Sequence, residues 1–339
     1  MTTDLLPALP LPVVLTAGVA VVLATAGLLS ARAATRPDLP AGRWHRDLPP
    51  AMAATLDHRG VRLLALGALL TGLGALAVHD EPVDGLTGVT VLTAAALLAG
   101  PLAHAVNPVR LAGSPPSRPT HGGPAPGWPA VVVLAVLAVV VLTVHDGRVL
   151  AAVGATYVAV QAALCRLRGP GWPATGDGLE AAATMIGHAA PLGRRDDGRL
   201  AWRNPVVSAA HVTLPRAALW LAAVVAGLTI AATTAAPAVP AFVATATAAG
   251  VLLQVGLIRS WFHGAAVPLA AAYGLLAGGR WLQPLDLAAF VALHAMAVAV
   301  LHRQAIARHD PRTARAVQFP ARGVVVVSVV AGLAVLAAA

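Results

Sequence analysis

Apolar residues recur along this chain in long runs, separated by short segments that contain proline, glycine and charged residues. A helix needs about 20 apolar residues, within a range of roughly 17–25, to cross a bilayer core about 30 Å thick. Ten runs approach or reach this length, and the fourth and eighth are the shortest. We predict ten membrane-spanning helices, at residues 11–31, 61–78, 86–106, 128–144, 149–167, 214–235, 239–258, 264–279, 285–301 and 323–338.

The distribution of arginine gives these spans an orientation. All 23 basic residues are arginines, and 21 of them lie in the odd-numbered connections between the predicted spans or within three residues of the span ends that border these connections. The other two are Arg148 and Arg280. Because arginine near short loops is retained in the cytoplasm during insertion, we expect the odd-numbered connections inside and both termini outside. The sequence therefore predicts an all-α bundle, a single polytopic domain over residues 1–339, in a bacterial cytoplasmic (inner) membrane.

Composition agrees with this class of protein. Apolar residues make up 58% of the chain and charged residues only 11%, with a mean hydropathy of +0.77, whereas soluble domains are about 25% charged. The net charge of +9 would suggest nucleic-acid binding in a soluble protein. Here the arginines lie between apolar runs, where they determine the orientation of the spans in the membrane. We therefore expect a lipid bilayer, and no nucleic acid, as the partner.

The longest connection, residues 168–213, contains the one helix that we predict outside the membrane. Asp177 followed three residues later by Glu180 is a plausible capping box, and apolar residues follow it at helical spacing. We predict a short amphipathic helix at residues 178–190 that lies on the inner membrane interface. The charged run at residues 193–199 predicts a turn.

The predicted spans contain few groups that could carry chemistry. No Asp or Glu lies at a span centre, which disfavours a proton pump that uses a buried carboxylate. Hydroxylated and small residues, such as the stripe Gly67, Thr71 and Ala75, are ordinary packing material between membrane helices. Motifs of serine hydrolases, zinc proteases and phosphate-binding loops do not occur in the sequence.

Histidine is the class of residue with the most interesting positions. His294 lies deep in the ninth span, His302 closes that span, and His104 lies near the inner end of the third. Neutral imidazoles in one half of a bundle could ligate a metal ion or a haem. The eight-residue spacing of His294 and His302 does not require this, because two ligands on one helical face are better placed four residues apart. Hydrogen bonding to a neighbouring helix is the alternative.

Several blocks of the sequence are distinctive, namely Asn107-Pro108-Val109-Arg110 and residues 157–161, 176–196, 294–305 and 310–320. They resemble a poorly characterised family of actinobacterial polytopic membrane proteins, often labelled fenitrothion hydrolase, and the resemblance extends over about half of the chain. The resemblance implies architecture more than activity, since no motif of this chain supports a hydrolase. Relatives carry a His-Tyr pair in the penultimate helical region, whereas residues 273–279 here contain no histidine.

Polar residues with distinctive positions converge on the predicted cytoplasmic side. We expect this side to be the functional surface of a small-solute transporter. A membrane-embedded enzyme, or a redox or metal-binding protein with His104, His294 and His302, is one alternative. A non-catalytic subunit of a membrane complex, or of a homo-oligomer, is another. The candidate cluster on the inner face consists of Asn107, Arg110, Asp177, Glu180, His188, Arg194, Arg195 and Arg303.

Overall fold

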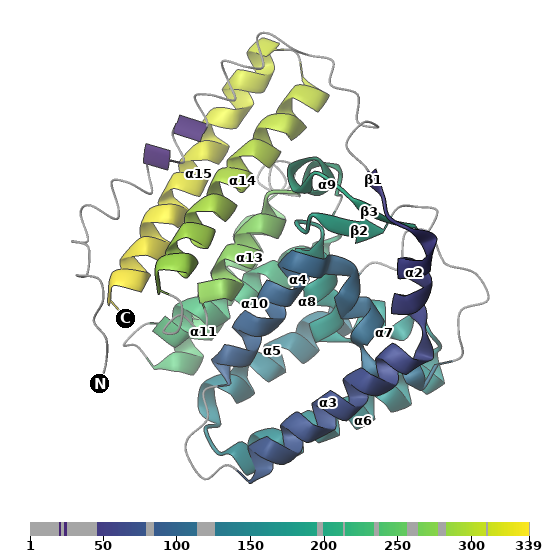
Figure 1. Cartoon of the computed structure of the whole chain (residues 1–339). Coiled ribbons are helices and arrows are strands. Elements are labelled where there is room, and N and C mark those ends of the chain that lie inside the picture. The colour runs from purple at the N-terminus through teal and green to yellow at the C-terminus, as the bar shows by residue number, and fades with distance from the viewer. Residues whose placement is uncertain are drawn as a thin grey trace.

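The computed structural model confirms that the protein is helical. The described residues contain thirteen α-helices, one short 3-10 helix and three short strands (Figure 1). The strands were not predicted. The structure describes residues 20–21, 24–25, 46–78, 85–113, 126–194, 199–212, 214–233, 237–255, 264–276, 283–309 and 311–338.

Nine of the ten apolar runs fold as helices, and seven of these lie within about four residues of their predicted bounds. The other two predictions are too short, because the helix predicted at 285–301 continues to Arg308 and the one predicted at 323–338 begins at Pro311, with Pro320 in its interior. Most of the first run lies outside the described residues. The nine helices are α3 (Arg59–Ala77), α4 (Leu86–Val106), α5 (Trp128–Thr143), α6 (Gly147–Arg168), α10 (Arg216–Thr233), α11 (Ala238–Gln254), α13 (Ala266–Leu276), α14 (Gln283–Arg308) and α15 (Pro311–Ala338).

Three helices in the described part of the chain are long and apolar enough to cross a membrane. They comprise Arg59–Ala77, Gly147–Arg168 and Ala288–Arg308. Five further apolar helices, within α4, α5, α10, α11 and α13, are shorter. These lengths and compositions indicate a membrane protein.

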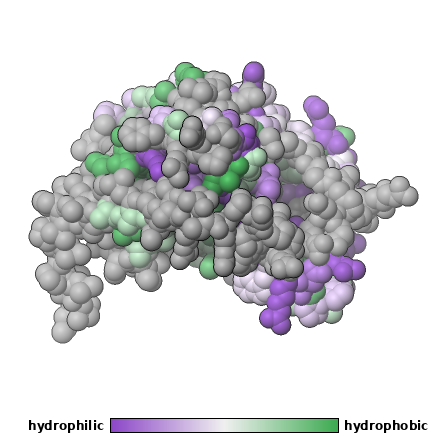
Figure 2. Space-filling model, turned by 90° about the horizontal axis from the view of Figure 1, so that it is seen from above, coloured by the Kyte–Doolittle hydropathy of each residue, from purple (hydrophilic) through white to green (hydrophobic). Residues whose placement is uncertain are grey.

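Large apolar side chains on the surface support the same conclusion. Leu64 of α3, Leu98 of α4 and Leu167 of α6 are 76%, 72% and 80% exposed. The view from above shows separate groups of apolar residues at the top, the upper left and the centre, with the largest groups of hydrophilic residues to the right (Figure 2). Exposed apolar area on this scale is unfavourable in water and is the surface that a bilayer covers.

The core is built from small residues that allow helices to approach closely. α10 packs against α5, α11 and α13, and α13, α14 and α15 follow one another beside it (Figure 1). A Cβ atom added to Gly227 of α10 would lie 2.8 Å from the Cβ of Ala246 of α11. Close backbone approach of this kind drives helix association where apolar burial gives no net gain.

α3 and α6 lie side by side at the lower right of Figure 1, at the edge of the bundle. No described residue of α3 is buried. The predicted stripe of small residues on α3 is open, since a Cβ atom added to Gly67 would have no neighbour within 4 Å. This stripe therefore makes no close helix contact within the described part of the molecule.

A small antiparallel sheet joins two connections that are far apart in the sequence. Its strands are β1 (Arg46–Asp47), β2 (Leu192–Arg194) and β3 (Leu200–Trp202), in the order β1-β3-β2. Residues 193 and 47 both face Ala201 in the register. The charged run that we predicted as a turn connects β2 to β3, although residues 195–198 lie outside the described residues.

The predicted interfacial helix exists, but its predicted location was wrong. α8 (Gly178–Gly187) packs against α4, α5, α7 (Trp172–Gly176), α10 and α13, and almost all of its residues are buried. Its residues are small or apolar on nearly every face, which is typical of a helix buried on all sides rather than on one stripe. Two glycines make the packing possible. A Cβ atom on Gly178 would meet the backbone of α5, and one on Gly187 the backbone of α4.

The remaining short helices connect these elements. α2 (Pro50–Asp57) precedes α3, and η2 (Pro108–Leu111), a single 3-10 turn, follows α4. α9 (Pro205–His211) follows the sheet and contacts α14. Each of the three begins with proline, which is favourable at the first helical position because its missing N–H would have no partner there.

Candidate functional site

The site begins where α4 ends. Asn107 adopts an extended conformation there, and its side-chain Oδ1 accepts a hydrogen bond from the Val109 N–H at 2.9 Å. Pro108 cannot continue the α-helix, so the chain turns into η2. Val109 is almost completely buried. This local structure anchors η2 and directs the side chains of Asn107 and Arg110 toward α8.

Asp177 begins α8 as predicted. Its Oδ1 accepts hydrogen bonds from the backbone N–H groups of Leu179 and Glu180, each at 3.0 Å. An aspartate at this position satisfies two donors that have no partner within the helix, and its charge interacts favourably with the helix dipole. The N-cap that the sequence predicted at Asp177 is therefore confirmed, whereas the Glu180 carboxylate of the predicted capping box bonds to Asn107 and Arg110.

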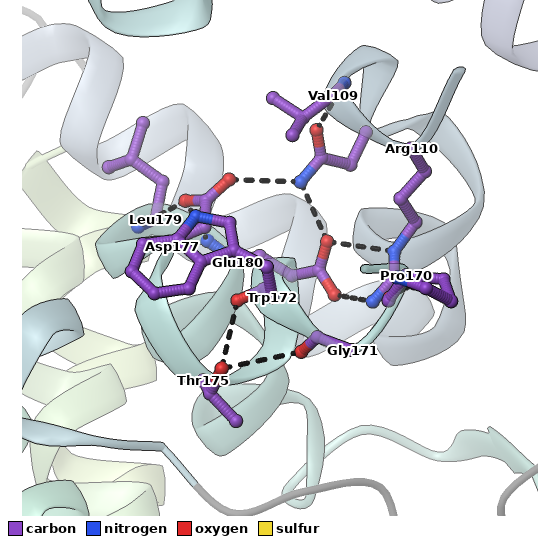
Figure 3. Close-up of polar contacts among 10 residues, drawn as sticks. Val109, Arg110, Pro170, Gly171, Trp172, Thr175, Asp177, Leu179 and Glu180 are labelled. Carbon is purple, nitrogen blue, oxygen red and sulfur yellow. Dashed lines mark hydrogen bonds and ion pairs between the residues drawn. The ribbon is translucent and has the colours of Figure 1, made fainter. Parts of the chain in front are cut away.

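Asn107, Arg110, Asp177 and Glu180 form one hydrogen-bonded group, which we call the polar cluster together with Tyr157 (Figure 3). Nδ2 of Asn107 donates to Oδ2 of Asp177 at 3.1 Å and to Oε2 of Glu180 at 2.6 Å. Nε of Arg110 donates to the same Glu180 oxygen at 3.0 Å. A second guanidinium nitrogen of Arg110 pairs with Oε1, so the ion pair is bidentate.

Tyr157 brings α6 into the polar cluster, because its hydroxyl donates a hydrogen bond to Oδ1 of Asp177. One helical turn later, Oε1 of Gln161 accepts a bond from Nε1 of Trp172 at 2.8 Å. The cluster therefore connects the end of α4, η2, α6 and α8. It joins the consecutive elements α4 and η2 to α6 and α8, which follow later in the chain, and so fixes their relative positions.

The polar cluster is buried and carries unequal charges. The side chains of Arg110 and Glu180 are 10% and 1% exposed, and Asp177 as a whole is 2% exposed. Burial, and secondarily the charge of Glu180, raises the pKa of the Asp177 carboxyl, although hydrogen bonds from Tyr157 and Asn107 oppose the rise. Among the described residues, two carboxylates and one guanidinium meet in the cluster, so these residues together carry an excess of one negative charge. A proton or a cationic group bound there would neutralise it.

The opposite end of α8 has its own polar contacts. Nε of Arg203 donates to the Ala190 carbonyl oxygen at 3.1 Å, and another guanidinium nitrogen donates to that of Gly187. A cation at this position donates hydrogen bonds to carbonyl groups that have no partner within the helix. It also interacts favourably with the negative end of the α8 dipole. Burial lowers the pKa of Arg203 to about 10. Burial, and then the charge of Arg203, lowers the pKa of His188 to about 4.

Acidification is expected to destabilise the protein through His188. Its pKa is about 4 in the folded state and near 6.5 when unfolded. Between these pH values the unfolded state binds more protons, so stability falls as the pH drops, by about 2 kcal/mol after allowance for partial exposure. We expect His188→Gln to remove this part of the acid sensitivity, measured as melting temperature in detergent. The exposed His211→Gln should retain it, and an unchanged profile in His188→Gln would contradict the assignment.

The remaining members of the predicted inner-face cluster lie elsewhere. His188 follows α8 at the end opposite Asp177, and Arg194 lies on β2. Arg303 is half-buried on α14. Arg195 lies outside the described residues. The structure thus brings together four of the eight predicted residues.

The three predicted metal-binding histidines are not shown to form one site. His104 lies on α4, but its side chain lies outside the described residues. The ring nitrogens of His294 contact the Phe290 carbonyl oxygen at 2.8 Å and the Ser328 hydroxyl at 3.2 Å, and Nδ1 of His302 contacts Oε1 of Gln318 at 2.8 Å. The residues that the structure describes contain no group of three or more His, Cys, Asp or Glu that could hold a metal. A metal or haem site therefore stays a prediction.

Two functional contacts were not predicted from the sequence. In the sequence, Tyr157 is a polar residue of the predicted span 149–167 and begins one of the family-like blocks, and Arg203 is one of many arginines. A tyrosine inside a long apolar run needs a partner for its hydroxyl, which was the available signal. The partner itself, Asp177, could be found only from the fold.

Comparison with known protein families, with curated proteins and with solved structures gives no match to the chain. The functional argument therefore depends on the geometry of the polar cluster.

Proposed function

We propose that the protein is a multi-pass protein of the bacterial inner membrane that translocates a small solute, and that the polar cluster is its binding site. The proposal includes ten spans, with the arginine-rich connections in the cytoplasm. The positive-inside rule supports this orientation, and the nine observed helices at the predicted runs are consistent with the number of spans.

The observation that carries the proposal is the burial of a charged cluster on helices too short to cross a membrane. α7 and α8 have 5 and 10 residues, yet both lie among apolar helices. Irregular backbone at such positions is tolerated in membrane proteins where protein covers it or where it lines a cavity. Transporters commonly build substrate and coupling-ion sites from the ends of such interrupted helices.

The charge balance supports a role beyond packing. A purely structural link between α4 and α8 would need only hydrogen bonds, which cost less to bury than ions. Asp177 and Glu180 instead share the Asn107 amide beside a single guanidinium. Ionisable residues that are buried among the helices of a membrane protein are candidates for substrate, ion or proton pathways.

Uptake measurements test the proposed function. A strain that lacks the protein is compared with the complemented strain for labelled amino acids, sugars, organic acids, nucleosides and inorganic cations. We expect at least one solute to accumulate at least about tenfold faster with the protein, and Glu180→Gln to abolish this gain. Asp47→Asn, which removes a surface carboxylate 3.7 Å from Arg199, is the matched control. Equal uptake of the whole panel by both strains would contradict transport.

The pH dependence of that uptake is a separate prediction. The raised pKa of Asp177 means that its carboxyl binds a proton at higher pH than an exposed aspartate does. Uptake by the wild type should therefore change with pH as this group titrates. Asp177→Asn keeps the helix cap but fixes a neutral side chain, so uptake should become independent of pH. A pH profile identical to that of the wild type would exclude Asp177 as the titrating group.

A further inference from the structure

A second polar group lies on the other side of the bundle, where α13, α14 and α15 meet. The Ser328 hydroxyl of α15 lies 3.2 Å from Nε2 of His294 and 2.8 Å from the Tyr273 hydroxyl. The Tyr273 hydroxyl also lies 3.1 Å from the Ser328 carbonyl oxygen, so its one hydrogen can be donated either to this oxygen or to Oγ. The rings of Tyr273 and Phe290 enclose the imidazole, with centroids 6.1 Å and 4.2 Å from it.

The contacts of His294 determine its tautomer when it is neutral. Nδ1 lies 2.8 Å from the Phe290 carbonyl oxygen, which can only accept a hydrogen bond. Nδ1 must therefore carry the hydrogen, and Nε2 is left with a lone pair. The Ser328 O–H then donates to Nε2. A base that is oriented by a third group and bonded to a hydroxyl is the arrangement of an activated nucleophile.

Other hydroxyls on the apolar helices bond to backbone carbonyl oxygens. Those of Thr71, Thr93 and Thr143 bond to the oxygen four residues earlier in their own helix, and those of Thr90 and Thr229 also bond to oxygens of α13. Such bonds are the usual way in which a membrane helix satisfies a hydroxyl. The hydroxyl of Ser328 is instead held by side chains of two other helices, which fixes its direction toward the base.

We propose that Ser328 and His294 form a nucleophile and general-base pair that cleaves carboxylic esters of apolar or amphiphilic molecules. Ser328 is half-buried, and its neighbours Val324 and Val327 are 48% and 68% exposed. His294 is fully buried beneath it. A substrate would therefore reach the hydroxyl across the exposed apolar face of α15. This approach favours esters with a large apolar part. This activity is separate from the proposed transport and uses none of the residues of the polar cluster.

The reaction follows from the hydrogen-bond pattern. Oγ of Ser328 adds to the ester carbonyl carbon while its proton passes to Nε2 of His294. The bond from carbon to the alcohol oxygen then breaks, and the alcohol leaves with that proton. Water then adds to the carbonyl carbon of the acyl-serine while His294 takes its proton. The bond from carbon to Oγ breaks, Oγ receives that proton, and the carboxylic acid is released. The Tyr273 hydroxyl, next to Oγ, is placed to donate to the carbonyl oxygen as it becomes negative.

A fluorophosphonate probe tests for the nucleophile directly, because it forms a covalent bond to activated serines. The purified full-length protein is labelled in detergent, and the modified residue is identified by mass spectrometry. We expect the probe on Ser328, no labelling of Ser328→Ala, and normal labelling of Ser208→Ala, which alters another half-buried serine. No labelling of the wild type, or labelling at a different residue only, would overturn the proposal.

His294→Gln tests the base while keeping a side chain that can bond to Ser328. We expect labelling to slow by about 100-fold or more, in line with loss of general-base catalysis. Hydrolysis of p-nitrophenyl octanoate, measured beside p-nitrophenyl acetate, reports the preference for an apolar acyl chain. A labelling rate equal to that of the wild type in His294→Gln would overturn the role of His294. Faster hydrolysis of the acetate would overturn the apolar substrate class.

Discussion

Replacement of Arg110 by leucine is expected to lower the free energy of unfolding by about 3–5 kcal/mol, the largest effect of any single change in the polar cluster. The substitution removes the bidentate partner of Glu180, whose side chain is 1% exposed. The negative charge of Asp177 remains beside it. The uncompensated buried charge is what costs stability. Denaturant titration of the purified protein in mixed micelles measures the change.

The control for this prediction is an ion pair of the same type at the surface. Arg199 lies 3.7 Å from Asp47, and their side chains are 61% and 39% exposed. Arg199→Leu should change the stability by less than about 1 kcal/mol, because water screens exposed pairs. Equal effects of Arg110→Leu and Arg199→Leu would show that the polar cluster is not buried as described.

Gly100→Ala is the second change with a large expected effect, a loss of about 2–3 kcal/mol. A Cβ atom at Gly100 would lie 2.7 Å from the Gly187 carbonyl oxygen and 3.0 Å from its Cα. These are backbone atoms of α8, so no side-chain rotation relieves the contact. α4 and α8 would have to separate, which disturbs the helix that carries Asp177 and Glu180. The melting temperature in detergent and the yield of folded protein report this.

Gly67→Ala provides the matched control, since it introduces the same methyl group into another apolar helix. A Cβ atom at Gly67 has no neighbour within 4 Å. Alanine is the better helix former, so this variant should be as stable as the wild type or more stable by up to about 1 kcal/mol. Equal losses from both variants would mean that the cost arises from the substitution itself and not from the contact of α4 with α8.

The sequence predicts the long helices well because the information is local. Each apolar run ends at residues that stop a helix by their own chemistry, as Asn107 and Pro108 do after α4. The cap at Asp177 was predictable for the same reason, since it concerns residues within one turn. Hydropathy thus placed seven helices within about four residues of their observed bounds, but it missed the polar extensions of α14 and α15 into residues 302–322.

The location of α8 could not be obtained from the same reasoning. We interpreted Asp177 and Glu180 as the polar side of a surface helix, because charged residues usually face water. In the structure a bidentate guanidinium and a shared amide replace that water. The partners Asn107 and Arg110 are 70 or more residues away, and no local pattern connects them. The absence of polar residues on the other faces of α8 was the one signal for burial.

The sheet was missed for a related reason. Its strands have two or three residues, too few for an alternating pattern, and β1 pairs with β3 across most of the first half of the chain. Strand pairing of this kind depends on contacts that form only after the helices have packed.

The double variant Arg110→Gln with Glu180→Gln tests most directly whether the polar cluster is a functional site. Replacing a buried ion pair by a neutral pair of similar shape removes both charges together, so the folded protein should keep most of its stability. We predict a melting temperature within a few degrees of the wild type and loss of the solute uptake that the wild type supports. A folded double variant that transports at the rate of the wild type would show that the charges only hold the helices together, and would contradict the proposed function.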